Sequence, residues 1–270
     1  MRRVAILGCG PAGLIAAHAA EESGHDVTIF SRKRKSETFG AMYLHEPIPG
    51  VSPEKPEMNI YISKIGTREG YAKNVYGNPN APVSWDTFAD GEVPAWSLRN
   101  AYGKLWHRYE SRIKDQNLTE NLLQLTCESY DKVFSTIPLQ AICTDWRHAF
   151  RSVAIRVIHG PARDVERQDC MVYNGMPYER NPNWYRYSYI NGYQAWEFSS
   201  RSQMMVPLTE GFQITEGMKP LDTDCDCHPE IHRLGRFGKW DKHTFTHHAW
   251  REVIDAVQPV LGSSQASSSH

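Results

Sequence analysis

The sequence of 270 residues predicts an α/β fold, in which a Rossmann-like domain is interleaved with a second domain that contains an antiparallel sheet. Three observations predict this fold. An apolar run near the start leads into three glycines with the spacing G-x-G-x-x-G, at residues 8–13. A strand pattern and an amphipathic helix pattern return much later, at 130–139 and 247–257. Between them, residues 184–199 are rich in aromatic side chains and alternate as a hairpin does.

The N-terminal stretch VAILGCGPAGLIAAHAA predicts a strand, a turn and a helix. Val4–Leu7 is the buried strand, residues 8–13 are the turn, and Leu14–Glu22 is the helix. The apolar run Val27–Phe30 is the next strand. A secretory signal is the alternative, but Pro11 and the three glycines would interrupt its helical segment.

Glycine is required at each of these three positions for a different physical reason. Gly8 makes the tight turn, Gly10 allows the backbone to approach a pyrophosphate, and Gly13 allows the helix to pack on the strand. The phosphates of a dinucleotide then lie at the helix N-terminus, where free N–H groups point at them. The predicted cofactor contacts of the turn are Gly8, Gly10, Pro11, Ala12 and Gly13.

The end of the second strand bears on which dinucleotide binds. NAD would favour an acidic residue there, to hold the ribose hydroxyls, but the sequence has Ser31. The basic run 32–35 that follows suits the 2′-phosphate of NADP, and it is equally typical of a solvated turn. Ser31 and Arg32 are predicted to lie at the adenosine end of the cofactor.

Three separated segments favour FAD. They are the first fifty residues, whose part FGAMYLHEPIPG holds Gly40 and Ala41; YDKVFSTIPL, Tyr130–Leu139; and GRFGKWDKHTFTHHAWREVIDAV, Gly235–Val257. Together they resemble the FAD-binding flavoprotein superfamily that includes amine oxidases and UDP-galactopyranose mutase. The resemblance implies that one FAD-binding domain is assembled from all three segments. FAD is expected to be held without a covalent bond, because no Cys or His lies in a recognisable flavin-attachment motif.

The resemblance also implies further contacts. Arg236 would meet the pyrophosphate, and Thr246 would be the N-cap of a helix 247–257 that points at the flavin. The additional cofactor-binding residues implied in this way are Gly40, Ala41, Thr136, Pro138, Gly235, Arg236, Trp240, Thr246 and His247.

The expected domain boundaries follow from these segments. The FAD-binding domain comprises residues 1–50, 121–146 and 229–262, and the substrate domain comprises 51–120 and 147–228. The low-complexity tail 263–270 is expected to be disordered.

The substrate domain contains a predicted amphipathic helix over Leu98–Tyr109 and a hairpin that turns at Asn191-Gly192. The hairpin is expected to form the roof over the flavin. The predicted catalytic residues are His45, Tyr185 and Tyr187, and the predicted substrate contacts are Arg99, Arg186, Trp196 and Arg201. The alternative for each aromatic residue is an ordinary place in the core or on a sheet face.

Charge and cysteine content bear on the binding partners of the protein and on its cellular compartment. The formal net charge is −1, so global charge does not indicate nucleic acid, although a local basic patch that binds it is possible. No membrane segment is predicted. Six scattered cysteines predict a reduced, cytoplasmic protein. CDCHPEIH offers Cys225, Cys227, His228 and His232 as metal ligands, but the spacing is tight and no metal is predicted.

These features predict an FAD-dependent oxidoreductase of the amine-oxidase type, which oxidises a C–N bond of a small or nucleotide-like substrate. GAMYLHEPIPG and NWYRYSYINGYQAWEFS also resemble small bacteriophage flavoproteins of nucleobase hypermodification. That resemblance implies an amino-acid-modified thymine in phage DNA as substrate, with a lyase outcome. The alternatives are a non-redox flavoenzyme like the mutase and an NADP-binding regulator without turnover.

Overall fold

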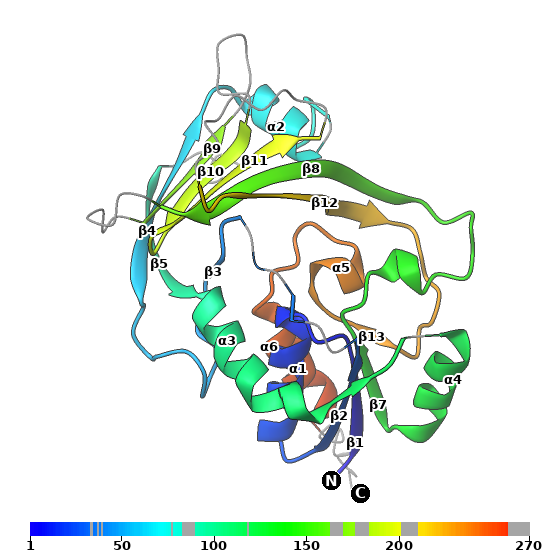
Figure 1. The fold of residues 1–270 in the computed structure, drawn as a ribbon. Helices are drawn as coiled ribbons and strands as arrows, with labels where there is room; N and C mark the ends of the chain where they lie inside the picture. Colours follow the sequence, from blue (N-terminus) through cyan, green and yellow to red (C-terminus); the bar gives the residue numbers. More distant parts are fainter. Residues whose placement is uncertain are drawn as a thin grey trace, which may run out of the picture.

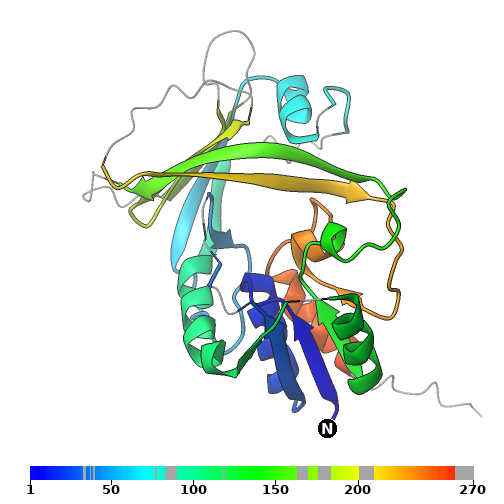
Figure 2. The same cartoon turned by 45° about the vertical axis from the view of Figure 1, so that its right-hand side comes forward.

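The structure of the chain is a computed structural model. It describes residues 1–258 apart from 33, 34, 37, 39, 77, 83–89, 118, 163–169, 176–183 and 201–209. Two sheets organise these residues. Figure 1 shows a small sheet surrounded by helices below a large curled sheet, and the turned view in Figure 2 shows the large sheet as a roof over the helical half.

The small sheet is parallel in every pairing and has the order β13-β7-β1-β2-β6. Its strands are β1 (Arg3–Leu7), β2 (Asp26–Ser31), β6 (Ile113–Asp115), β7 (Lys132–Ser135) and β13 (His232–Arg233). β1 and β7 are buried almost throughout, as expected for strands that helices cover on both faces.

Helices cover both faces of this sheet. On one face, α1 (Pro11–Glu22) packs against α6 (His248–Val257) and α3 (Leu98–Tyr109), and the three form the largest core cluster. On the other face, α4 (Glu120–Ser129) places Leu123 in a second cluster with Val133 of β7. The predicted doubly covered α/β arrangement is confirmed.

The large sheet has eight strands in the order β12-β8-β11-β10-β9-β4-β5-β3, and only β4 and β9 pair in parallel. The strands are β3 (Tyr43–Leu44), β4 (Met58–Ile65), β5 (Gly91–Ser97), β8 (Phe150–Pro161), β9 (Cys170–Gly175), β10 (Trp184–Ile190), β11 (Tyr193–Ser199) and β12 (Gln213–Thr223). The predicted antiparallel sheet is therefore mixed at one pairing.

The remaining helices are short. They are α2 (Arg68–Tyr76), α5 (Gly235–Lys239) and the 3-10 turns η2 (Glu110–Arg112) and η3 (Leu139–Ala141). α5 lies under the long arch of β8 and β12 (Figure 1). Within the described residues, no helix is long and apolar enough to span a membrane.

Two local predictions are confirmed closely. The helix over Leu98–Tyr109 forms with these bounds, and the Ser97 side chain caps it by accepting a hydrogen bond from Asn100 N at 3.2 Å. The hairpin turns at Asn191 and Gly192, whose φ values of 48° and 72° lie in the left-handed region that a two-residue turn requires.

One boundary differs from the prediction. Residues 51–120 were expected to belong wholly to the substrate domain, yet α3 packs on α1 and β6 pairs with β2. The part of this segment from Leu98 onward therefore belongs to the parallel-sheet half. The physical reason is that α3 presents its apolar face to α1, where Tyr102 and Leu105 are fully buried.

Substitution by alanine is expected to change the free energy of unfolding in opposite directions at two helical glycines. A Cβ at Gly103, inside α3, would meet no atom within 4 Å, whereas a Cβ at Gly238, in α5, would lie 2.5 Å from the backbone oxygen of Ser135. Gly103→Ala should stabilise the protein by about 0.5–1 kcal/mol, because alanine loses less backbone entropy in a helix. Gly238→Ala should destabilise it by roughly 1–3 kcal/mol through overpacking. Chemical denaturation of both variants checks the pair, and equal effects would contradict the packing described for α5.

Candidate functional site

The glycine-rich turn after β1 is held by backbone contacts that exclude larger side chains. A Cβ at Gly13 would lie 2.0 Å from the carbonyl oxygen of Gly8, and a Cβ at Gly8 would lie 2.5 Å from Thr136 Oγ1. Gly8 also has a φ of 103°, which favours glycine. By contrast, a Cβ at Gly10 would meet only Ser36 Oγ, at 3.5 Å. The turn is therefore packed on the protein side and open at Gly10.

The open side of the turn is the N-terminus of α1. Gly10 is its N-cap residue, Pro11 takes the first helical position, and no side chain caps the helix. The first intrahelical hydrogen bond runs from Leu14 N to Gly10 O at 3.0 Å, so the N–H groups of Ala12 and Gly13 precede it. This arrangement suits the binding of a pyrophosphate.

Tyr102 of α3 holds the turn in place. Its hydroxyl donates to the carbonyl of Cys9 at 3.0 Å and accepts from the N–H of Ser36, also at 3.0 Å. The side chain thereby joins the glycine-rich turn to the loop after β2. The sequence pattern predicts for Tyr102 only a place on the apolar face of a helix, because a hydroxyl contact across 93 positions leaves no local signal.

The three predicted cofactor segments meet at this turn. A Cβ at Gly235, the first residue of α5, would lie 2.9 Å from Ala12 Cβ. Thr136 follows β7 and donates its hydroxyl to the carbonyl of Leu7 at 3.2 Å, and Pro138 continues the same exit. Gly235 also needs its left-handed φ of 68°. The proximity expected of residues far apart in the sequence is thus present, whereas their contact with a cofactor stays a prediction.

Two residues of the third segment lie differently from the prediction. Trp240 is fully buried in a core cluster with Leu139, and its indole N–H donates to the carbonyl of Arg151 at 2.9 Å. Core packing and that hydrogen bond account for its side chain. Thr246 is not the N-cap of α6: the cap residue is His247, without a side-chain hydrogen bond, because the turn before the helix takes up residues 245–248. The predicted helix is otherwise correct.

Ser31 and Arg32, which are predicted to lie at the adenosine end of the cofactor, have two polar neighbours that the sequence did not predict. Ser31 ends β2 and stands in register with Asp115 of β6, so the structure brings an acidic residue beside the serine. The guanidinium of Arg32 donates to Asn117 Oδ1. Neither Asp115 nor Asn117 was predicted, since their position depends on a strand pairing between distant segments.

The roof presents a cluster of charges to the parallel-sheet half. Glu197 of β11 is 5% exposed at its side chain, forms an ion pair with Lys219 and lies 3.5 Å from Arg186. Burial raises the pKa of Glu197, but the positive charges of Lys219 and Arg186 outweigh it, so the net pKa is lowered. A Cβ at Gly40 would lie 2.9 Å from Glu197 Oε1, which places Gly40 directly below the carboxylate.

Two further cations join this cluster from the segment after β13. Arg236 of α5 is close enough to Arg186 and Glu197 for their charges to act on its pKa, which burial and Arg186 lower. Lys242 Nζ lies 3.2 Å from the ring centroid of Tyr76 and has no hydrogen-bond partner among the described residues. Burial, and then the charges of Lys219, Arg186 and Arg236, lower its pKa to about 7. The cluster thus holds four basic side chains and one buried carboxylate, which are Arg186, Lys219, Arg236, Lys242 and Glu197.

His45 and His247 come together beside this interface. Their ring centroids are 5.9 Å apart, and Phe245 contacts both rings, 5.1 Å from His45 and stacked on His247 at 5.6 Å. His247 is 6% exposed. Burial, followed by the charges of His248, His45 and Arg251, lowers the pKa of His247 to about 4. A neutral imidazole at the start of α6 is the result.

The aromatic residues of the roof divide between its two faces. In the β10–β11 register, Arg186 pairs with Glu197 and Tyr187 pairs with Trp196, so the second pair lies on the opposite face from the charges. There Tyr187 stacks on Tyr173, with centroids 6.3 Å apart. This placement does not support the predicted catalytic role of Tyr187 or the predicted substrate contact of Trp196.

A β-bulge explains why Tyr185 and Tyr187 lie on opposite faces of the sheet. The register shifts between Trp184 and Arg186, and Tyr185 packs against Val157 and Ala195 on the face that carries Glu197. The predicted alternation could not contain the bulge. Tyr185 therefore lies on the face that its predicted role requires.

Arg99 lies at the edge of the same interface. Its guanidinium carbon is 3.3 Å from the ring centroid of Tyr193, and its Nη2 donates to Thr38 O at 2.9 Å. A cavity of about 130 Å³ opens there between Gly40, Met42, Arg99 and Tyr193, and Ala41 continues the loop. Arg201 lies outside the described residues.

Comparisons with solved structures identify this architecture. Reduced UDP-galactopyranose mutase matches with a TM-score of 0.52 at 11% identity, over 95% of this chain and 94% of that chain. CtdE in complex with FAD matches with a TM-score of 0.50 at 12% identity, over 94% and 82%. CtdE with FAD and substrate 4 matches with a TM-score of 0.52 at 13% identity, over 94% and 79%. The chain has the flavoprotein fold. No family model and no curated protein sequence matches it.

The pKa of His247 predicts a pH dependence of stability. The pKa is about 4 in the folded protein and about 6.5 in the unfolded chain, so the unfolded chain binds more protons between these values. Stability should be complete above pH 6.5 and fall as the pH drops toward 4, by up to roughly 3 kcal/mol. Denaturation at several pH values should show this loss reduced in His247→Gln. His107→Gln, at a side chain that is 92% exposed, is the control and should keep it.

Proposed function

We propose that this chain is an FAD-dependent oxidoreductase. The observation that carries the proposal is the meeting of three distant segments at the turn after β1: Gly13 against Gly8, Gly8 against Thr136, and Gly235 against Ala12. Such a meeting builds one cradle around the N-terminus of α1, directly below a sheet that carries buried charges. The fold shared with CtdE, whose structure holds FAD, supports the same cofactor here.

The residues present fit FAD along its length. The N–H groups of the first turn of α1 would hold the pyrophosphate, and the Arg236 guanidinium would add a charge-assisted hydrogen bond to it. Ser31 would contact the ribose at the end of β2. The flavin would lie beside the Gly40–Glu197 contact and under the roof, near the neutral His247 at the N-terminal end of α6.

Bound flavin supplies a hydride acceptor, and the chain supplies binding, orientation and exclusion of water. The roof covers the interface, so ionic contacts beneath it act at low dielectric. Lys242 and Lys219 would bind an anionic group of the substrate, since Glu197 offsets only part of the positive charge around them. Tyr185 and His45 remain the candidates for contact with the reacting atoms.

The substrate that we propose is a small or nucleotide-like molecule with an oxidisable C–N bond and an anionic group. An amino-acid-modified thymine in phage DNA meets this description: the carbon of its C–N bond would give a hydride to the oxidised flavin, and water would hydrolyse the resulting imine of the substrate to an amine and a carbonyl compound. The net outcome is separation of the amino-acid part from the base, as in the lyase outcome, and oxygen would reoxidise the reduced flavin. The cation cluster supports the anionic part of this proposal. The resemblance of residues 40–50 and 183–199 to phage flavoproteins supports the nucleobase, and through it a nucleic-acid partner.

A non-redox reaction is the second candidate. It is favoured by the fold match to UDP-galactopyranose mutase, which extends over 94% of that chain. A sugar nucleotide would also bring an anionic diphosphate to the cation cluster. Consumption of oxygen during turnover without added reductant would separate an oxidase from a mutase.

Release of the cofactor tests the proposal directly. Protein purified in its native state should be yellow, and heat or acid should release a compound with the mass of FAD, because the residues described form no covalent attachment motif. Mass analysis of the supernatant gives the result. Colourless protein that binds NADP, and that FAD cannot reconstitute, would instead support the regulator without turnover.

A substitution at Arg236 tests its proposed contact with the pyrophosphate of FAD. Arg236→Ala should weaken FAD binding by roughly 1.5–3 kcal/mol, or about 10- to 150-fold, through loss of a charge-assisted hydrogen bond. The control is Lys239→Ala in the same helix, where the lysine pairs with Glu252 at 2.7 Å. Titration of both apoproteins with FAD measures the difference. Equal affinities would place Arg236 away from the phosphates.

A further inference from the structure

A second cluster of reactive side chains lies outside the proposed cofactor site. It joins the segment between η3 and β8 to the segment between β12 and β13. Four ligand atoms, from Cys143, His148, Cys225 and Cys227, all lie within 4.8 Å of one another. None of these residues takes part in the contacts described for the cradle or the roof charges.

The spacing of these atoms is that of a tetrahedral metal site. Cys143 Sγ and Cys227 Sγ are 3.8 Å apart, and His148 Nδ1 lies 3.3 Å from the first sulfur and 3.6 Å from the second. A tetrahedral zinc ion, with Zn–S of about 2.3 Å and Zn–N of about 2.0 Å, requires S···S of about 3.8 Å and S···N of about 3.5 Å. The Sγ atoms of Cys143 and Cys227 and the Nδ1 atom of His148 already stand close to these separations, and Cys225 Sγ lies within 4.8 Å of all three.

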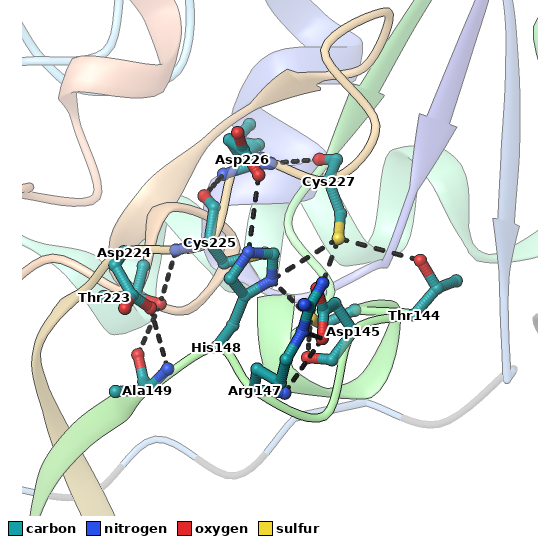
Figure 3. Close-up of polar contacts among 12 residues, drawn as sticks. Thr144, Asp145, Arg147, His148, Ala149, Thr223, Asp224, Cys225, Asp226 and Cys227 are labelled. Carbon is teal, nitrogen blue, oxygen red and sulfur yellow. Dashed lines mark hydrogen bonds and ion pairs between the residues drawn. The ribbon is translucent and has the colours of Figure 1, made fainter.

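The surroundings orient the ligands as a metal site requires. The far ring nitrogen of His148, Nε2, lies 3.4 Å from Asp226 Oδ1, which leaves Nδ1 directed toward the sulfur atoms (Figure 3). A carboxylate on the second nitrogen fixes the tautomer that binds a metal. The Arg233 guanidinium donates to the carbonyls of both Cys225 and Cys227, and so holds their loop in shape.

Direct contacts between the two segments support the same arrangement. Ala149 N donates to Asp224 Oδ1 at 2.7 Å, and Thr223 Oγ1 donates to Ala149 O at 2.7 Å (Figure 3). These bonds keep the ligand pairs opposed without a metal. The two segments that carry the ligands are therefore joined by hydrogen bonds of their own, next to the ligand residues.

We propose that Cys143, His148, Cys225 and Cys227 bind a structural zinc ion. Three cysteines and one histidine are a donor set typical of structural zinc, and four protein ligands leave no position for a substrate. The ion would fasten the base of the β8–β12 arch to the parallel sheet, just before the chain enters β13. This proposal is independent of the flavin.

The site revises two expectations from the sequence. The sequence predicts no metal, and the motif CDCHPEIH places Cys225 and Cys227 beside His228 and His232 only. Those histidines lie elsewhere: His228 Nε2 contacts Ile142 O at 3.1 Å, and the His232 ring packs on Phe134 with centroids 5.1 Å apart. The true partners are about 80 positions away, so spacing along the chain could not reveal them.

Metal content of the full chain tests the proposal. Protein purified without chelator, in reducing buffer, should contain about one zinc ion per chain by mass spectrometry of the metal. His148→Ala should lose it, whereas His148→Cys should keep it, since four thiolates also bind zinc. Asp226→Asn should bind about 10- to 100-fold more weakly. The control is Cys127→Ser, at a cysteine of α4 outside the cluster, which should retain full occupancy.

Cobalt provides a second measurement on the unmodified chain, so the test does not depend on the folding of any variant. Replacement of zinc by Co²⁺ should give the visible absorption of a tetrahedral thiolate site, read as a difference spectrum against the metal-free protein. Two results would overturn the proposal. One is metal-free native protein that takes up neither ion. The other is a mass decrease that shows a disulfide between Cys143 and Cys227 under the same reducing conditions.

Discussion

The approach of Gly13 to the carbonyl of Gly8 is the constraint on which the rest of the structure depends. At that point a helix rests on the backbone of the turn that precedes it, and no side chain fits between them. The same closeness recurs where Gly238 meets the Ser135 carbonyl. Because these contacts are made with backbone atoms, α1 is held closely on the turn after β1, and α5 on the end of β7. A cradle assembled from distant segments needs such contacts.

Electrostatics supply the second organising element. The interface under the roof contains more positive than negative charge. The Glu197 carboxylate lowers the free-energy cost of burying these positive charges. Unpaired buried charge is costly, so such a cluster is stable mainly when an anion joins it. The depressed pKa of Lys242, about 7, expresses that cost in the protein alone. Ligand binding and lysine protonation should therefore be linked.

The sequence predicted the parts of this structure whose causes are local. The strand, turn and helix around residues 8–13, the helix that Ser97 caps and the Asn191-Gly192 turn all follow from neighbouring residues. Its errors arise where distant segments decide. The bulge beside Tyr185, the transfer of β6 to the parallel sheet and the grouping of His148 with Cys227 depend on pairings that no local pattern encodes.

The path of the chain between the two sheets has a consequence for folding. It passes from β2 to β3, returns from β5 into α3, leaves again from β7 to β8, and comes back from β12 to β13. Neither half is a continuous stretch: the parallel-sheet half needs residues from both ends of the sequence, and the large sheet needs strands from both sides of the segment 98–135. The molecule should consequently melt as one cooperative unit, and cleavage in a surface loop should not liberate a folded fragment. The parallel-sheet half and the roof above it should therefore unfold together and not as two separate domains.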